Sequence, residues 1–352
     1  MILTIIIFLL LLTVLVAVHE FGHYFMAKRA GMEVEEFGFG IPPRIWGKKI
    51  GETFWSINAL PIGGFVKVKG VENTNKKNES DPKSYQSKTW FQKFGFIIGG
   101  VVMNFLLAIV LLTIGYSVGM NPVWGTDLYK ENIKIDGIYV VDVMENGSAA
   151  KVLEQDDLII SVNNEKIESA EQFKYALQQS RGKSLNAMVE RDGKIFKMNI
   201  PVNREGKIGV GFRVEGVLNK VKLPVYKALY VSTLQTYQVS RETLKALGTM
   251  IMERSTEQIA GPVGIVRLTG QVIEYGFIAF LQFAALLSLS LGVINIIPFP
   301  ALDGGRALIL IIEGILRRRL PQKIEIVIHG IGFALLMILI ALVTIEDIKK
   351  FF

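Results

Sequence analysis

The sequence of 352 residues contains no cysteine and only three histidines. The absence of cysteine excludes disulfide bonds, thiol catalysis and zinc sites built with cysteine ligands. Any metal ion must therefore be held by histidine, aspartate or glutamate. Charged residues are also scarce, at 20% of the chain, whereas hydrophobic residues reach 50%. This balance predicts membrane-spanning helices combined with soluble segments.

The formal net charge is +7. Nucleic-acid binding would require a basic stripe on a soluble fold, and the sequence shows none, so no nucleic-acid partner is predicted. We interpret the positive charge as basic cytoplasmic loops that face anionic membrane lipid.

Four apolar segments are long enough to cross a bilayer, which requires about 20 residues. They cover residues 2–26, 94–120, 277–299 and 326–343. The first lacks the basic start and the small-residue cleavage site of a signal peptide, so we expect it to remain as a helix. Lysine and arginine concentrate after the first span and between the third and fourth. The positive-inside rule therefore places both of these loops in the cytoplasm, and both termini and residues 121–276 outside.

Residues 29–93 are predicted to form a cytoplasmic or re-entrant β-loop followed by a linker, with a polar stretch at 72–83. Short strands are expected at 37–41, 53–57 and 64–69, separated by turns rich in proline and glycine. Two interpretations remain open. The loop is either a small cytoplasmic β-domain or a sheet that dips into the membrane, where irregular backbone must be buried in protein or line a cavity.

Residues 121–215 are predicted to form a compact α+β domain, with a capped helix that starts at Ser169 and a hairpin about Asp192 and Gly193. This order of elements is typical of a PDZ domain, which binds peptide termini by strand addition. Residues 216–276 look like an amphipathic helical connector. The predicted organisation therefore has four spans or span-containing segments, at 1–28, 94–120, 277–306 and 326–345. The β-loop lies between the first and second, and the PDZ-like domain and the connector lie between the second and third. A cytoplasmic loop at 307–325 joins the third to the fourth, and a tail at 346–352 follows.

The motif His19-Glu20-Phe21-Gly22-His23 lies near the end of the first span. On a helix, residues four apart share a face, so both imidazoles can reach one metal ion. Zinc with three protein ligands makes its water acidic enough to ionise near neutral pH, and Glu20 is placed to take a proton from that water. Ionisable groups within a span are costly and mark function by default.

A catalytic zinc ion needs a third protein ligand. His329 is the remaining histidine, at the start of the fourth span. Asp303 is the better candidate, because the first and third spans end on the same side in the predicted topology and so bring Asp303 and His23 to similar depths. Pro298 and Pro300 break the helix before Asp303, which is acceptable only around a polar cavity.

These motifs resemble the site-2 protease family of intramembrane zinc metalloproteases. The resemblance rests on residues 19–23 together with Asn-Ile-Ile-Pro-Phe-Pro-Ala-Leu-Asp-Gly-Gly at 295–305, and it is closest to the bacterial branch of regulator-of-sigma-E proteases. Residues 61–67, Asn104, the single PDZ-like domain and residues 261–265 also match, so the resemblance covers nearly the whole chain.

The resemblance implies a polytopic α-helical protein of the bacterial cytoplasmic membrane, with four transmembrane helices, a membrane-associated β-loop and an extracytoplasmic PDZ-like domain. It implies a metalloendopeptidase that cleaves within the transmembrane segments of single-span proteins, such as anti-sigma factors or signal-peptide remnants. The implied site residues are the zinc ligands His19, His23 and Asp303, the general base Glu20, and the substrate-binding residues Asn295, Gly64 and Phe65.

The sequence departs from the family pattern at two places. Gly99-Gly100-Val101 replaces the usual Gly-Pro before Asn104, and residues 153–157 replace the usual glycine-rich turn of the PDZ-like domain. Two other functions are compatible with parts of the sequence. An inactive scaffold that binds partners through the PDZ-like domain would not need all of His19, Glu20, His23 and Asp303. A zinc transporter would need repeated acidic or histidine sites across several spans.

Overall fold

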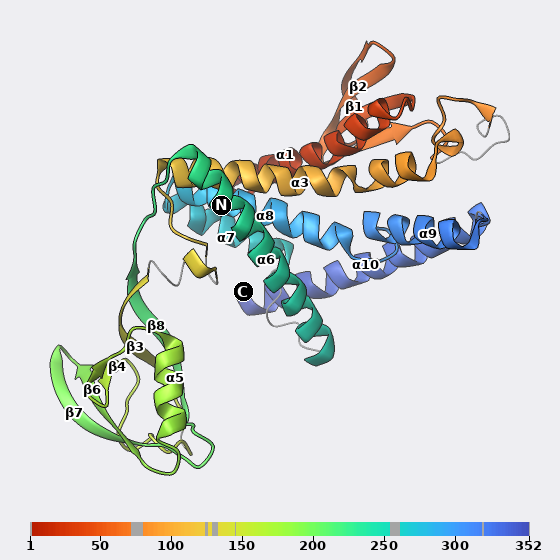
Figure 1. Cartoon of the computed structure of the whole chain (residues 1–352). Coiled ribbons are helices and arrows are strands. Elements are labelled where there is room, and N and C mark those ends of the chain that lie inside the picture. The colour runs from red at the N-terminus through yellow and green to blue at the C-terminus, as the bar shows by residue number, and fades with distance from the viewer. Residues whose placement is uncertain are drawn as a thin grey trace. The chain divides into compact units, whose positions relative to one another are not determined.

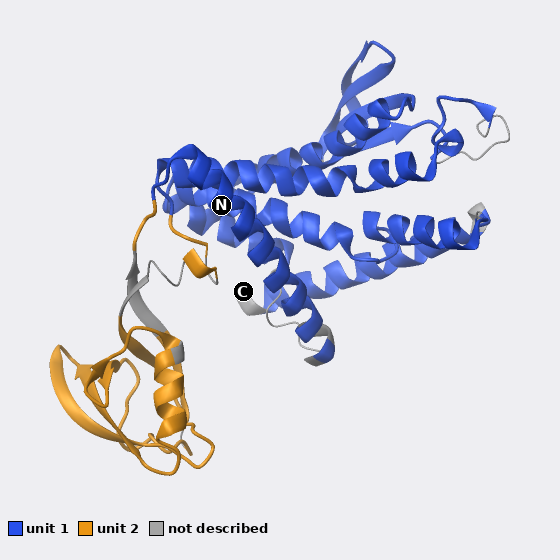
Figure 2. Ribbon diagram, in the orientation of Figure 1, with its two compact units in different colours: residues 1–120, 222–352 blue, residues 121–221 orange. Residues whose placement is uncertain are grey.

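The computed structural model describes residues 2–71, 80–123, 126–128, 133–144, 146–253, 261–318 and 320–351. Residues 72–79 of the predicted linker and residues 254–260 of the predicted connector lie outside this part of the chain. The chain divides into two units, of which one comprises residues 1–120 and 222–352 and the other residues 121–221 (Figure 2).

Unit one contains helices that match all four predicted spans. They are α1 (Ile2–Arg29), α3 (Trp90–Val118), α8 (Phe277–Ile296) and α10 (Gln322–Phe351). Each contains a stretch long and apolar enough to cross a membrane, which confirms the predicted polytopic fold. Helix α3 packs against both α1 and α8 (Figure 1). Buried Leu11 and Leu15 of α1 and Ala284 of α8 meet partly buried leucines of α3 in a shared core.

The glycines in the first half of α3 let it approach α1 closely. A Cβ atom built on Gly22 of α1 would lie only 2.2 Å from the carbonyl oxygen of Gly99, so the two backbones are in direct contact. Small residues permit such close packing between membrane helices. Helix α3 runs without interruption through Gly99 and Gly100, where the family pattern has a proline. The helix therefore keeps its geometry in spite of this departure.

The prediction of three separate short strands after α1 is wrong in number. The three segments join into two long strands, β1 (Val34–Ile50) and β2 (Thr53–Val68), connected by a turn at Gly51 with φ +63°. Gly51 forms a turn as expected, whereas the other prolines and glycines expected to form turns lie within strands whose pairing shifts register repeatedly. Such shifts absorb irregular residues while the strand continues. The hairpin packs against α1 through β2.

The described part of unit one also contains the helices α6 (Val225–Glu253), α7 (Pro262–Glu274) and α9 (Asp303–Leu316), and a short 3-10 helix at Tyr85–Ser87. Most of α9 falls in the segment predicted as the 307–325 loop. Helix α6 lies against α3, where the hydroxyl of Tyr116 donates to Oε1 of Gln235 at 2.5 Å. The first turn of α7 is tied to α10, because the N–H of Gly264 donates to Oδ2 of Asp347 at 2.7 Å.

Unit two is a mixed α+β domain. Its elements are β3 (Ile133–Val143), β4 (Leu158–Val162), β5 (Glu165–Lys166), α5 (Ala170–Gln179), β6 (Ser184–Arg191), β7 (Lys194–Pro201) and β8 (Val210–Leu218). The strand order is β7-β6-β4-β3-β8, with β5 paired to β4. Ser169 caps α5 by accepting from the N–H of Gln172, and β6 and β7 form the hairpin about Asp192 and Gly193. Both features confirm the sequence prediction.

Candidate metal centre

Two histidines of α1 and the first residue of α9 meet inside unit one. Nε2 of His19 and Nε2 of His23 are 3.2 Å apart. Oδ2 of Asp303 lies 3.0 Å from the former and 3.3 Å from the latter. One ligand atom from each of the three residues lies within 4.8 Å of the other two. The helical spacing of the histidines thus presents both rings on one face, and the start of α9 supplies a carboxylate opposite them.

The donor set fits a zinc ion. Asp303 Oδ2 is buried and accepts no hydrogen bond from any described residue, although burying an unsatisfied carboxylate oxygen is costly. Both histidine side chains are also buried. Two imidazole nitrogens and one carboxylate oxygen that converge on a common point are a ligand set that zinc favours in catalytic sites. A cation at this point would satisfy all three donor atoms together.

Helix α3 fixes which ring nitrogen of each histidine faces the metal site. Nδ1 of His23 donates to the carbonyl oxygen of Phe96 at 2.8 Å. The side-chain nitrogen Nδ2 of Asn104 lies 3.1 Å from Nδ1 of His19. A histidine that binds metal through Nε2 carries its proton on Nδ1. Rotation of the Asn104 amide by 180° would bring its buried Oδ1, which has no hydrogen-bond partner among the described residues, into position to accept that proton. The contact with Phe96 therefore leaves the Nε2 lone pair of His23 available for a cation, and the turned Asn104 amide would do the same for His19.

The turn between α8 and α9 positions Asp303. Ala301 adopts a left-handed backbone conformation with φ +80°, and its N–H donates to Nδ1 of His329 at 3.0 Å. His329 therefore supports the turn and lies outside the group of His19, His23 and Asp303. A Cβ atom on Gly304 would lie 2.2 Å from the carbonyl oxygen of Ile297. The glycine after Asp303 is thus required because α9 begins directly against this turn.

A cavity of about 100 Å³ adjoins the three donor atoms. Glu20 lies in its wall, so a carboxylate that can exchange protons faces the same space as the donor set. Strand β2 passes beside it, since a Cβ atom on Gly64 would lie 3.5 Å from Cγ of Glu20. The lining residues are His19, Glu20, His23, Val66, Phe96, Ile97, Asp303 and Arg306.

The predicted substrate-binding residues are distributed unevenly around this cavity. Gly64 lies beside Glu20, whereas the ring of Phe65 packs over Gly38 of β1. Asn295 lies half-buried in the last turn of α8, and neither it nor Phe65 lines the cavity. Sequence reasoning missed Arg306, which lies three residues after Asp303 in α9. The helical spacing from Asp303 was the available signal, because residues three apart share a helix face.

A helix-borne pair of histidines with an adjacent glutamate and a distant aspartate, in a bundle of apolar helices, defines a membrane metalloprotease. A family model for peptidase family M50 matches residues 7–339. The chain belongs to peptidase family M50 and is an intramembrane zinc metalloprotease. This confirms the resemblance to the site-2 proteases, and it favours the enzyme over the inactive scaffold.

The chain is similar over nearly its whole length to several proteins. It is 33% identical to a Clostridium perfringens protein whose name places it among the zinc metalloproteases, over 97% of each chain. It is 28% identical to the zinc metalloprotease RasP of Geobacillus kaustophilus, over 99% of this chain and 98% of that protein. The PDZ domain of the SdrC-like protein of Listeria monocytogenes aligns with 22% of this chain and 87% of its own, at 24% identity and a TM-score of 0.20.

Proposed function

We propose that His19, His23 and Asp303 hold the catalytic zinc ion and that Glu20 is the general base for hydrolysis of a peptide bond in a substrate's transmembrane segment. The observation that carries this assignment is the convergence of three donor atoms within 4.8 Å of one another, in the wall of the cavity that Glu20 also lines. We propose single-span membrane proteins as the substrates. The cavity is lined in part by α1 and α3, which are apolar enough to span a membrane, and this supports substrates that lie in the membrane.

Different residues of the site carry out different parts of the hydrolysis. A zinc ion held at this site would supply an acidified water molecule and polarise the scissile carbonyl group. Glu20 accepts the proton from the water and returns it to the leaving nitrogen. The carbonyl of Phe96 holds His23 in the tautomer that the site needs, and Asn104 would do the same for His19 through its amide oxygen. Arg306 adds a positive charge to the wall that Glu20 and Asp303 share.

We propose that β2 receives the substrate as an added strand. A helical peptide hides its carbonyl groups, so a substrate helix must unwind, and strand pairing satisfies the backbone groups that unwinding exposes. The position of Gly64 beside Glu20 supports this role. The hairpin also exposes large apolar side chains, among them Ile45, Trp46 and Ile50. Their exposure favours a hairpin that lies in the membrane over a small cytoplasmic β-domain.

Asp303→Asn is expected to lower both zinc binding and cleavage. Asparagine has nearly the same shape but no charge, so it removes the anionic ligand with little effect on packing. The test is cleavage of a single-span reporter in membranes, with zinc measured on the purified protein. Asp347→Asn, at a buried aspartate that caps α7, is a matched control for folding. The ligand assignment is wrong if Asp303→Asn binds zinc as tightly as the wild-type chain.

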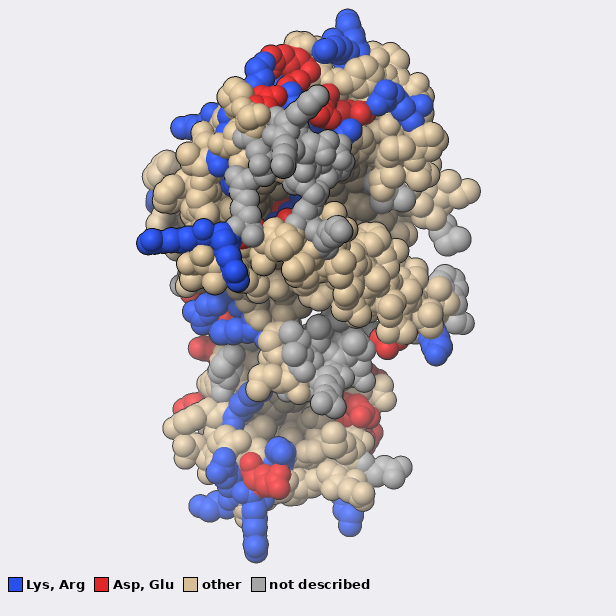
Figure 3. Space-filling model, turned by 90° about the vertical axis from the view of Figure 1, so that its right-hand side faces the viewer, with Lys and Arg blue, Asp and Glu red and all other residues tan. Residues whose placement is uncertain are grey.

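We propose that unit two and both chain ends lie outside the cytoplasm, with the β1–β2 hairpin and the α9–α10 turn on the cytoplasmic side. Basic residues at the cytoplasmic ends support this orientation, including Lys28 and Arg29 in the last turn of α1. The face of unit one in the upper part of Figure 3 carries several such Lys and Arg side chains, with acidic ones among them.

The lack of cysteine makes this orientation directly testable. Asp192→Cys, at the tip of the β6–β7 hairpin, should react with a membrane-impermeant maleimide in intact cells. Gly51→Cys, at the tip of the β1–β2 hairpin, should react only after the cells are permeabilised. The reverse pattern of labelling would show that the orientation is inverted.

A further inference from the structure

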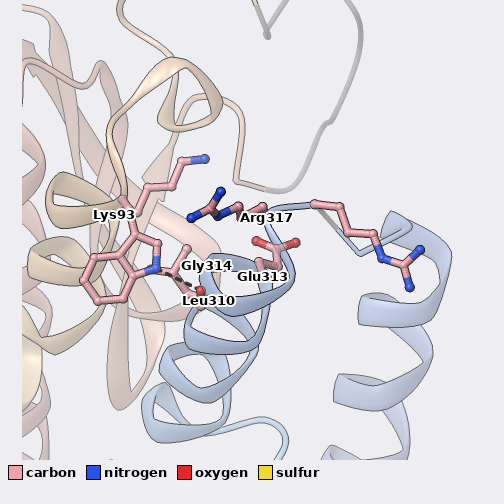
Figure 4. Close-up of a pocket in the computed structure, with 7 residues that line it drawn as sticks. Lys93, Leu310, Glu313, Gly314 and Arg317 are labelled. Atoms are coloured by element: carbon pink, nitrogen blue, oxygen red, sulfur yellow. Dashed lines mark hydrogen bonds between the residues drawn. The ribbon is translucent and has the colours of Figure 1, made fainter.

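A second cavity, of about 210 Å³, lies where α3 begins and α9 ends (Figure 4). It shares no lining residue with the cavity at Glu20. Its walls are held together by Trp90, whose indole N–H donates to the carbonyl oxygen of Leu310 at 2.9 Å. Gly314 makes room for the indole, because a Cβ atom there would lie 2.9 Å from Nε1 of Trp90. The cavity is therefore built into the junction of α3 and α9.

The charges around this cavity are predominantly positive. Lys93, Arg317 and Arg318 line it together with the carboxylate of Glu313, and a second carboxylate, that of Glu325, lies close enough to interact electrostatically with Glu313 and Lys93. The Glu313 carboxylate accepts a hydrogen bond from the N–H of Leu320 at 2.7 Å and so stabilises the turn after α9. Among the described residues, neither arginine forms an ion pair with a carboxylate.

Two of these cations face one another. Figure 4 shows the side chains of Lys93 and Arg317 extending toward each other from α3 and α9. The side chain of Lys93 reaches this position from a residue that is only 9% exposed, and its ammonium lies 5.2 Å from the centre of the Tyr85 ring. Like charges held across a cavity repel, and an anion between them converts that repulsion into attraction. The cavity therefore suits a phosphate group.

The surroundings of the cavity indicate that the phosphate belongs to a lipid. Helix α3 starts at Trp90 and continues into an apolar span, and tryptophan favours the membrane interface. Beside the cavity, α9 exposes Ile311, Ile315 and Leu316. This apolar face could cover an acyl chain, whereas a free phosphate ion would make no use of it. We propose that an anionic phospholipid binds here, with its phosphate between Lys93 and Arg317, its acyl chains along α9, and Arg318 adding positive charge from the same cavity lining.

A lipid in this position would join the two elements that hold the metal site. Helix α3 carries Phe96, whose carbonyl oxygen orients His23, and α9 begins with Asp303. A headgroup bound to both helices stabilises their relative placement, and with it the geometry of the ligands. This consequence for catalysis rests on the proposed zinc site, whereas binding of the lipid does not depend on it.

The test uses the purified full-length protein in nanodiscs of phosphatidylcholine, with phosphatidylglycerol added in increasing amounts. Bound lipid is counted by native mass spectrometry, and the unfolding temperature is measured in parallel. The variant Arg317→Gln/Arg318→Gln is compared with Lys48→Gln/Lys49→Gln, which removes two adjacent exposed cations from β1. Since each cation near a membrane surface contributes roughly 1 kcal/mol, loss of both arginines should weaken phosphatidylglycerol binding by about 30-fold.

The wild-type chain and the lysine variant should retain phosphatidylglycerol and unfold at a higher temperature in its presence. The arginine variant should unfold normally in phosphatidylcholine, show no such rise, and cleave the reporter more slowly. Equal binding by both variants would overturn the proposal, as would a site that inorganic phosphate fills as well as the lipid does. Lipid binding without any zinc or cleavage would refute the proposed function and leave the lipid site intact.

Discussion

Glu20→Gln is expected to abolish cleavage while zinc binding remains. Glutamine keeps the shape of the side chain but cannot accept a proton from water, and general-base catalysis contributes typically 10²–10⁴-fold. None of the three proposed ligand atoms belongs to Glu20, so the metal site should persist. The measurement is reporter cleavage in membranes at matched expression, with zinc determined on the purified variant.

Glu52→Gln is the matched control for this substitution. Glu52 lies at the turn of the hairpin, where its exposed carboxylate pairs with Lys83 at 2.6 Å, and exposed ion pairs contribute little to stability. The Glu52→Gln variant should therefore cleave the reporter as the wild-type chain does. Unchanged cleavage by Glu20→Gln would contradict the proposed mechanism. Metal transport in place of proteolysis would instead predict transport that survives the substitution and no cleavage by either chain. Loss of zinc together with activity would instead assign Glu20 to the structure of the site.

Gly100→Ala should remove zinc binding and activity through a single methyl group. A Cβ atom at this position would lie 2.5 Å from Nε2 of His23 and 2.7 Å from Nε2 of His19, where ordinary contacts begin at 3.4 Å. The imidazoles would have to retreat by about 1 Å, and a displacement of that size can cost about 100-fold in rate. Zinc affinity should fall together with cleavage, because the same two nitrogens are moved.

The control for this effect is Gly248→Ala in α6, where an added Cβ atom meets nothing within 4 Å. Alanine favours a helix over glycine by about 1 kcal/mol, so this variant should be slightly more stable and fully active. A thermal unfolding curve recorded with a metal chelator present separates loss of the site from loss of the fold. If Gly100→Ala retained zinc and cleaved normally, the histidines would have to bind metal in a different arrangement.

The local features of the site could be predicted from the sequence, because their spacing dictates their geometry. Residues 19 and 23 share one helix face whatever else the chain does. Predicting where Asp303 lies required a longer inference. The distribution of lysine and arginine gave the membrane topology, and the topology placed Asp303 at a depth in the membrane similar to that of His23. His329 shows why that step mattered, since it holds the N–H of Ala301 and lies apart from the ligand group. The assignment of the ligands themselves stays a prediction.

Contacts between distant segments could not be predicted in the same way. Asn104 matched the family pattern, but its approach to His19 depends on how closely α1 and α3 pack. The register shifts of β1 and β2 depend on tertiary packing, so the turn residues gave too many strands. In the turn at 153–157, the sequence departs from the family pattern and the structure nevertheless forms a turn. Asp156 adopts φ +72° without glycine, and its carboxylate accepts the hydroxyl of Tyr139 at 2.5 Å.

The distribution of the donor atoms along the chain also sets an order of events during biosynthesis. His19, His23 and Asn104 belong to the first third of the polypeptide, and Gly22 and Gly99 bring their helices into direct contact. Asp303 is translated only near the end. A nascent chain therefore carries two histidines beside a glutamate for most of its synthesis, without the carboxylate that completes the proposed ligand set. With the ligands proposed here, the peptidase would acquire its full metal site only when α9 has emerged.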